Sequence, residues 1–166
     1  MDFELKIEFI DKIRNQLKTD LETLQKIAEK EKSFATSKEM QAEGKYDTRK
    51  VEASYLAGAQ ARRVEELKQN YLKLKNFSCK DHSKNLEITV GSLIECFKED
   101  DINSSKCYYF ISPGIGGLSF ELNNKKIQIV SRFSPIGKAL LASHVEDEFE
   151  LKIKSLKVCL VIKKQV

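Results

Sequence analysis

Apolar residues near the start of the chain recur with alternating spacings of four and three. The residues in this series are Phe3, Ile7, Ile10, Leu17, Leu21, Leu24 and Ala28. Such spacing is typical of a coiled-coil seam, in which one face of a helix packs against a partner helix. Because no proline or glycine precedes Gly44, we predict one helix from about residue 3 to about residue 40, roughly 55 Å long at ~1.5 Å per residue.

A second series with the same spacing follows a glycine-containing stretch. Its members are Ala53, Ala57, Gln60, Val64, Leu67, Tyr71 and Leu74. The stretch between the two series, EGKYDTRKVEASYLAG, begins at residue 43 and carries Gly44 near its start, which indicates a turn. We therefore predict an antiparallel helical hairpin (coiled coil) over residues 1–76, with its tip near 41–50.

The apolar period changes to two after a polar linker that we place at 77–85. The strands predicted from this alternation are 86–97, 106–112, 126–131, 148–154 and 157–163. One short helix interrupts them at 134–141, where Ser134 can cap the free amides and Pro135 suits the first turn. The predicted fold class is α+β, with the hairpin followed by a small β-sheet domain over 86–166.

Charge and cysteine content argue against nonspecific nucleic-acid binding and against a zinc site. The 166 residues include 29 Lys or Arg and 25 Asp or Glu, and a net charge of +4 is too small to predict nonspecific nucleic-acid binding. The cysteines are Cys79, Cys96, Cys107 and Cys159, and with only two histidines and no CxxC pair they do not predict a zinc site. No signal-peptide pattern or apolar run of about 20 residues occurs, so we expect a cytoplasmic protein without a membrane segment.

The segment SPIGKALLASHVEDEFEL, residues 134–151, combines the capped helix with an acidic turn and an alternating strand. Its own physical chemistry is that of a packing device, because the cap, the apolar helix face and the strand support one another. The segment also resembles the signature SPxGxALLGxxxGDEVEV of the C-terminal domain in bacterial Gre-type transcription elongation factors. The matching residues are Ser134, Pro135, Gly137, Ala139, Leu140, Leu141, Asp147 and Glu148, whereas Ala142 and Glu146 replace glycines.

This resemblance implies a fold and a mechanism. The β-sheet domain is expected to be FKBP-like and to dock on the rim of the RNA polymerase secondary channel, while the coiled-coil tip enters the channel. The protein would then be an accessory factor, not an enzyme, that stimulates the polymerase to cleave backtracked RNA. RNA polymerase is the implied partner and the RNA 3′ end an indirect one. The factor would have no cofactor of its own, but would share Mg²⁺ with the polymerase.

Two acids at the tip are the catalytic and metal-binding candidates that the resemblance implies. Asp47 and Glu52 would act in the polymerase active centre by helping to hold the shared Mg²⁺. The local alternatives are that Asp47 caps a helix and that Glu52 is a first-turn acid stabilised by the helix dipole. If the family's tip tyrosine is superposed on Tyr55 without a gap, its acidic positions fall on Thr48 and Val51.

Further residues are candidates for contact with the polymerase. These are Tyr46, Arg49, Tyr55, Ser134, Pro135, Ile136 and Gly137. The alternative role of the two tyrosines is to staple the helices of the hairpin together.

Three other functions remain open at this point. One is a regulator that occupies the secondary channel without promoting cleavage. A second is a dimerisation arm, which predicts apolar stripes on the outer faces of the hairpin. A peptidyl-prolyl isomerase or chaperone is a remote third, because it would depend on the implied FKBP-like fold alone.

Overall fold

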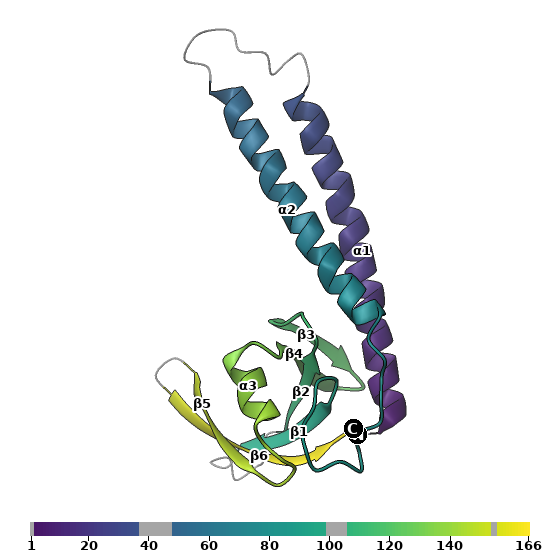
Figure 1. Ribbon diagram of the computed structural model, residues 1–166, viewed down its shortest axis with the longest axis vertical. Coiled ribbons are helices and arrows are strands. Elements are labelled where there is room, and N and C mark those ends of the chain that lie inside the picture. Colours follow the sequence, from purple (N-terminus) through teal and green to yellow (C-terminus); the bar gives the residue numbers. More distant parts are fainter. Residues whose placement is uncertain (1, 37–47, 99–105, 154–155) are drawn as a thin grey trace. The chain divides into compact units, whose positions relative to one another are not determined.

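The computed structural model describes residues 2–36, 48–98, 106–153 and 156–166 (Figure 1). Its elements are α1 (Phe3–Ala35), α2 (Arg49–Lys75), β1 (Leu93–Lys98), β2 (Lys106–Ser112), β3 (Leu118–Leu122), β4 (Lys125–Ser131), α3 (Pro135–Leu141), β5 (Glu148–Ile153) and β6 (Leu156–Gln165). This order confirms the predicted α+β class, in which two long helices precede a sheet with one short helix.

The chain divides into two compact units. Arg14–Leu72 forms a helical unit, whereas Met1–Ile13 and Lys73–Val166 together form the sheet unit. The first turns of α1 therefore belong with the sheet, although the sequence places residues 1–76 in the hairpin. The predicted domain boundaries themselves stay a prediction.

In the helical unit, α1 and α2 run antiparallel (Figure 1). The predicted seam of α2 is confirmed from Ala53 to Tyr71, because these members of the second series are half-buried whereas most residues between them are exposed. Leu74, the last member, is buried and belongs to the sheet unit. Leu17 and Leu21 are buried on α1. Ile7 departs from the predicted seam, since its side chain is 41% exposed. The reason is that the first turns of α1 pack on the sheet through a different set of residues, which includes Phe9.

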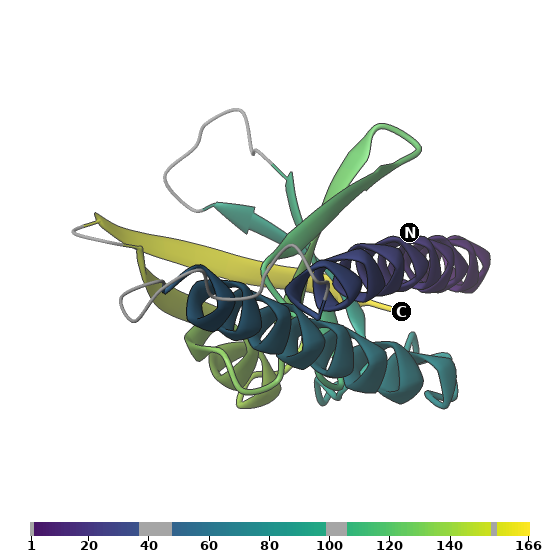
Figure 2. The same ribbon diagram turned by 90° about the horizontal axis from the view of Figure 1, so that it is seen from above.

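Among the described residues the sheet has six strands, in the order β3-β4-β2-β1-β6-β5. The pair β2·β4 is parallel, and all other neighbours are antiparallel. β6, the longest strand with 10 residues, runs between β1 and β5 (Figure 2). The predicted strand 106–112 is confirmed in full, and the other predicted strands overlap observed ones.

Two predictions for the sheet were wrong. The predicted strand 86–97 begins only at Leu93, because the chain turns at Gly91, where φ is +96° and the Phe77 ring lies against the Cα. Strand β3 was missed, since its five residues lie between two turn-rich segments. Asn123 and Asn124, with φ of 50° and 58°, connect β3 to β4, as in a tight hairpin turn that requires positive φ.

Both faces of the sheet are covered in part. On the α3 side the buried cluster comprises Ile88, Ile94, Cys96, Tyr109, Ile111, Val130, Leu140, Phe149, Leu160 and Ile162. On the opposite side Phe9 of α1 meets Phe110 and Phe120 edge to face, with ring centroids 5.6 and 6.3 Å apart. Aromatic pairs in this geometry add to the energy of burial. No helix in the described residues has the length and apolarity needed to cross a membrane.

Candidate functional site: the start of α3 and the base of the hairpin tip

The segment from residue 131 to residue 137, here called the α3 platform, is held by a helix cap. Ser134 has an extended backbone, and its Oγ accepts a hydrogen bond from the Gly137 amide at 3.0 Å. The same hydroxyl donates to the Ser131 carbonyl at 2.8 Å. Pro135 occupies the first helical turn, where its missing N–H costs nothing. The cap predicted at Ser134 is confirmed.

Two glycines bring main chain against main chain at Ser131. A Cβ on Gly137 would lie 2.1 Å from the Ser131 carbonyl oxygen, and a Cβ on Gly116 would lie 2.6 Å from the Ser131 amide nitrogen. Neither position has room for a side chain, so α3 and the 113–117 loop sit directly on the end of β4. Gly137 is buried by this packing, while its predicted contact with a partner stays a prediction.

The α3 platform exposes an aromatic ring next to a cation. Phe133 is 62% exposed, and the Arg132 guanidinium lies 4.6 Å from its ring centroid. Pro135 is exposed and Ile136 half-buried. Sequence reasoning named Ser134 to Gly137 but missed Arg132 and Phe133. The available signal was an Arg-Phe pair directly before a helix cap, since aromatic and arginine side chains are enriched where proteins bind proteins.

The second predicted site is only partly within the described residues. Tyr46 and Asp47 fall in 37–47, outside the part of the chain that the structure describes. Helix α2 begins at Arg49, so Thr48 rather than Asp47 directly precedes the helix. Thr48 Oγ1 lies 3.3 Å from Glu52 Oε1, and the Glu52 amide donates to the Thr48 carbonyl at 3.0 Å. Glu52 is an exposed first-turn acid, as its sequence position predicts.

The start of α2 also exposes apolar and aromatic side chains. Tyr55 is 76% exposed, and Val51 and Leu56 are each 53% exposed. The alternative in which Tyr55 staples the two helices is therefore wrong, because a stapling ring would be buried between them. These side chains give the described base of the tip an apolar surface beside Glu52.

The described residues contain no group of three or more His, Cys, Asp or Glu side chains that could hold a metal ion. Glu52 by itself offers one exposed carboxylate at the base of the tip. Magnesium often takes only one or two protein carboxylates and keeps several waters. A single exposed carboxylate such as that of Glu52 has the chemistry to serve as one of these ligands.

A separate polar cluster lies inside the sheet unit. The Lys6 side chain is fully buried, and its Nζ donates to the carbonyls of Lys80 and Val166, the latter at 2.8 Å. Burial lowers the pKa of Lys6 to about 8, although Cys79 and Asp81 act in the opposite direction. These contacts tie the first turns of α1 to the segment after α2 and to the end of β6, which assigns Lys6 a structural role.

His82 lies beside this cluster and is 7% exposed. Its Nδ1 is 2.7 Å from the Thr89 hydroxyl. Burial, followed by the charge of Lys6, lowers the pKa of His82. Both effects favour the neutral ring, which is hydrogen-bonded to Thr89 in the interior of the sheet unit.

Comparison with known proteins gives matches among solved structures only. No family model matches the chain, and no curated protein matches its sequence. GreA factor homolog 1 (Gfh1) of Thermus thermophilus is 19% identical, over 92% of this chain and 94% of that chain, with a TM-score of 0.39. Gfh1 of Thermus aquaticus is also 19% identical, over 98% and 94%, with a TM-score of 0.37.

A third match is the prokaryotic transcription elongation factor GreA/GreB from Nitrosomonas europaea. It is 14% identical, over 68% of this chain and 88% of that chain, with a TM-score of 0.36. Identities and TM-scores this low carry no functional argument.

Proposed function

We propose that this chain is a Gre-type transcription factor that binds RNA polymerase. The α3 platform would dock on the polymerase, and the hairpin would carry the tip into the secondary channel. There Asp47 and Glu52 would stimulate the polymerase to cleave backtracked RNA. The chain would act as an accessory factor, and Mg²⁺ would be shared with the polymerase.

The observation that carries this proposal is the α3 platform. Two glycines and a serine cap fix its backbone, and this rigid surface presents Phe133, Arg132 and Pro135 outward. A preorganised surface loses little conformational entropy on binding, and exposed aromatic and arginine side chains are the residue types that dominate binding energy. Phe133 and the Arg132 guanidinium, 4.6 Å from its ring centroid, are thus available to a partner surface.

The hairpin supports the second half of the proposal. Its helices contain 33 and 27 residues, which correspond to roughly 50 Å and 40 Å at ~1.5 Å per residue. The Glu52 carboxylate lies at the first turn of α2, next to the tip. In a two-metal reaction an additional carboxylate helps to place the second ion and the attacking water, which is the chemistry that Glu52 and Asp47 would supply.

Binding is tested by a pull-down of purified core RNA polymerase with the full chain. We expect binding by the wild type and at least about a tenfold loss with Phe133→Ala, as for a hot-spot aromatic residue. Leu86→Ala is the matched control, because Leu86 is 69% exposed on the same unit but outside the platform. Absence of wild-type binding at modest salt would refute the proposal.

Cleavage is tested on stalled elongation complexes with the wild type, Asp47→Asn and Glu52→Gln. We expect the wild type to stimulate cleavage and both variants to lose the stimulation. Glu66→Gln is the control, because Glu66 is an exposed acid on α2 well away from the tip. Equal cleavage by all four proteins would remove the two tip acids from the mechanism.

A channel-occupying regulator without cleavage activity is the second candidate. The observation that favours it is Val51, which is 53% exposed at one of the two positions where the family's acids fall in the superposition on Tyr55. An exposed valine cannot bind a metal, but it can contact an apolar channel wall. Binding to polymerase with inhibition of initiation, and with no gain in cleavage, would select this function.

A further inference from the structure

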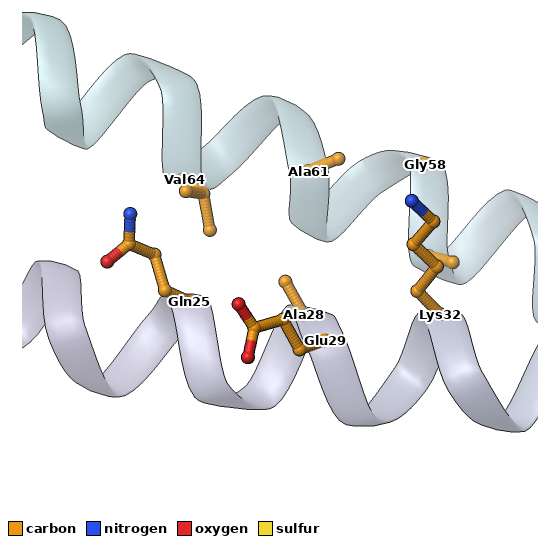
Figure 3. A pocket seen from close by; sticks show the side chains of 8 residues that line it. Gln25, Ala28, Glu29, Lys32, Gly58, Ala61 and Val64 are labelled. Atoms are coloured by element: carbon orange, nitrogen blue, oxygen red, sulfur yellow. The ribbon is translucent and has the colours of Figure 1, made fainter.

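The two helices of the hairpin enclose a groove of about 470 Å³ on one flank of their seam (Figure 3). Small and apolar side chains form most of its lining, namely Ala28, Ala57, Gly58, Ala61 and Val64. Three longer side chains from α1 complete it, which are Gln25, Glu29 and Lys32. Gln25 and Lys32 extend toward α2 at the two ends of the groove, and Glu29 lies between them (Figure 3).

Small residues at the groove permit a close approach by another helix. A Cβ on Gly58 would meet nothing within 4 Å, so the surface there is open. Closely packed helix pairs place small residues at their contacts, because the main chains can then come near each other. A volume of this size between two helices is large enough for side chains from a further helix.

The described part of the hairpin beyond the groove also exposes apolar side chains. Within residues 51–73 of α2 every side chain whose burial is described is exposed or half-buried. Exposed apolar side chains occur on both helices, namely Ile27, Phe34, Leu56 and Leu72. Two amphipathic helices cannot enclose a core by themselves, whereas four can.

The charges beside the groove indicate which molecule covers it. Glu29 and Lys32 are three residues apart on α1 and carry opposite charges. A two-fold axis that crosses α1 between them would place Glu29 of each copy against Lys32 of the other. In such an isologous contact the same patch is complementary to itself. We propose that the groove is the dimer interface for a second copy of this chain, packed antiparallel into a four-helix bundle.

The dimer has a consequence that depends on the proposed function above. A four-helix bundle is thicker than one hairpin, so a channel that admits the hairpin excludes the dimer. Dimerisation would then store the factor in a form that cannot act, and dilution or polymerase binding would release the monomer. The dimer itself is tested without polymerase, so its failure is distinguishable from failure of the proposed function.

Sedimentation equilibrium of the full chain measures the assembly. We expect a mass of about 38 kDa, twice the 19.0 kDa of one chain. The dimer should dissociate on dilution, with a Kd between ~1 µM and ~100 µM. Glu29→Lys and Lys32→Glu, made singly, place like charges together at two symmetric contacts. Each should weaken the dimer by at least about tenfold.

The double exchange Glu29→Lys with Lys32→Glu should restore the dimer, because it rebuilds both opposite-charge contacts. Gly58→Leu fills the groove and should abolish the dimer, while helix content stays the same or rises because leucine favours helix over glycine. Glu66→Lys is the control. It changes the net charge by the same amount as Glu29→Lys, but Glu66 lies on α2 and does not line the groove. A wild type that is monomeric at every concentration, or a double exchange that fails to restore assembly, would overturn the proposal.

Discussion

Replacing Lys6 by methionine tests whether a buried amine controls the stability of the sheet unit. Methionine keeps a long unbranched stem but removes the amine that donates to Lys80 and Val166. A neutral amine has two N–H groups, which match the two carbonyls, whereas an ammonium carries a third proton and a charge into the interior. The pKa of Lys6 is lowered to about 8 because burial disfavours the charged form, although Cys79 and Asp81 act in the opposite direction.

The magnitude follows from the pKa. Lowering it from 10.5 to about 8 corresponds to about 3.5 kcal/mol, at ~1.4 kcal/mol per pH unit. Between pH 8 and pH 10.5 the unfolded chain binds more protons at this residue than the folded chain does. Stability from this residue therefore rises with pH across that window and does not change below it. Between pH 7 and pH 10 the expected gain is about 2.5 kcal/mol.

The assay is urea denaturation of wild type and Lys6→Met at pH 7 and pH 10, followed by circular dichroism. At pH 7 we expect the two proteins to differ by less than about 2 kcal/mol, because two carbonyls lose a donor while the cost of burying a charge disappears. At pH 10 the wild type should gain about 2.5 kcal/mol relative to the variant.

The comparison between the two proteins cancels other groups that titrate at alkaline pH. Lys12→Met provides the control, because Lys12 is an exposed lysine of the same helix whose Nζ donates to the Glu121 carbonyl. Its pH profile should parallel that of the wild type. Parallel profiles for wild type and Lys6→Met would refute the reasoning, since they would mean that Lys6 titrates alike in the folded and unfolded chain.

Three further predictions concern stability, and each is checked by denaturant unfolding. Ser134→Ala should cost about 1 kcal/mol, because the Gly137 amide loses its cap; an unchanged stability would contradict the cap. Gly137→Ala should cost about 2 kcal/mol or more, since the new methyl would meet the Ser131 carbonyl, and full stability would contradict that packing. Asn124→Val should cost about 1–2 kcal/mol, because φ is 58° there and a β-branched residue resists that conformation, whereas Asn124→Gly should be as stable as wild type or more so.

The parts of the fold that could be predicted are those in which the apolar face of an element packs within one unit along its whole length. The second series predicts the half-buried face of α2 from Ala53 to Tyr71, because all of these residues lie within one helical unit. In the first series the predicted seam position of Ile7 is wrong, because its side chain is exposed. The first turns of α1 belong to the sheet unit and the rest of α1 to the helical unit, and the apolar spacing does not change at that boundary. Lys6 could not be predicted as buried, since lysine normally keeps its charge in water.

The candidate site was predictable to a similar extent. The start of α3 could be predicted, because a serine that can cap free amides and a proline in the first turn are local signals of a helix N-terminus. Phe133 lies in an apolar alternation that is also typical of core residues, so its 62% exposure could not be predicted from the sequence. Glu52 was predicted as a first-turn acid because that depends on the helix alone.

The position of β6 in the sheet sets an order for folding. Helices α1 and α2 depend on local contacts and can form soon after synthesis, whereas Ile94 of β1 pairs with Gln165 of β6, 71 positions later. Pairings this distant are slow, because the intervening chain must be ordered first. During translation β1 would therefore expose one unpaired edge until β6 has left the ribosome. That interval is when aggregation, or capture by a chaperone, is most to be expected.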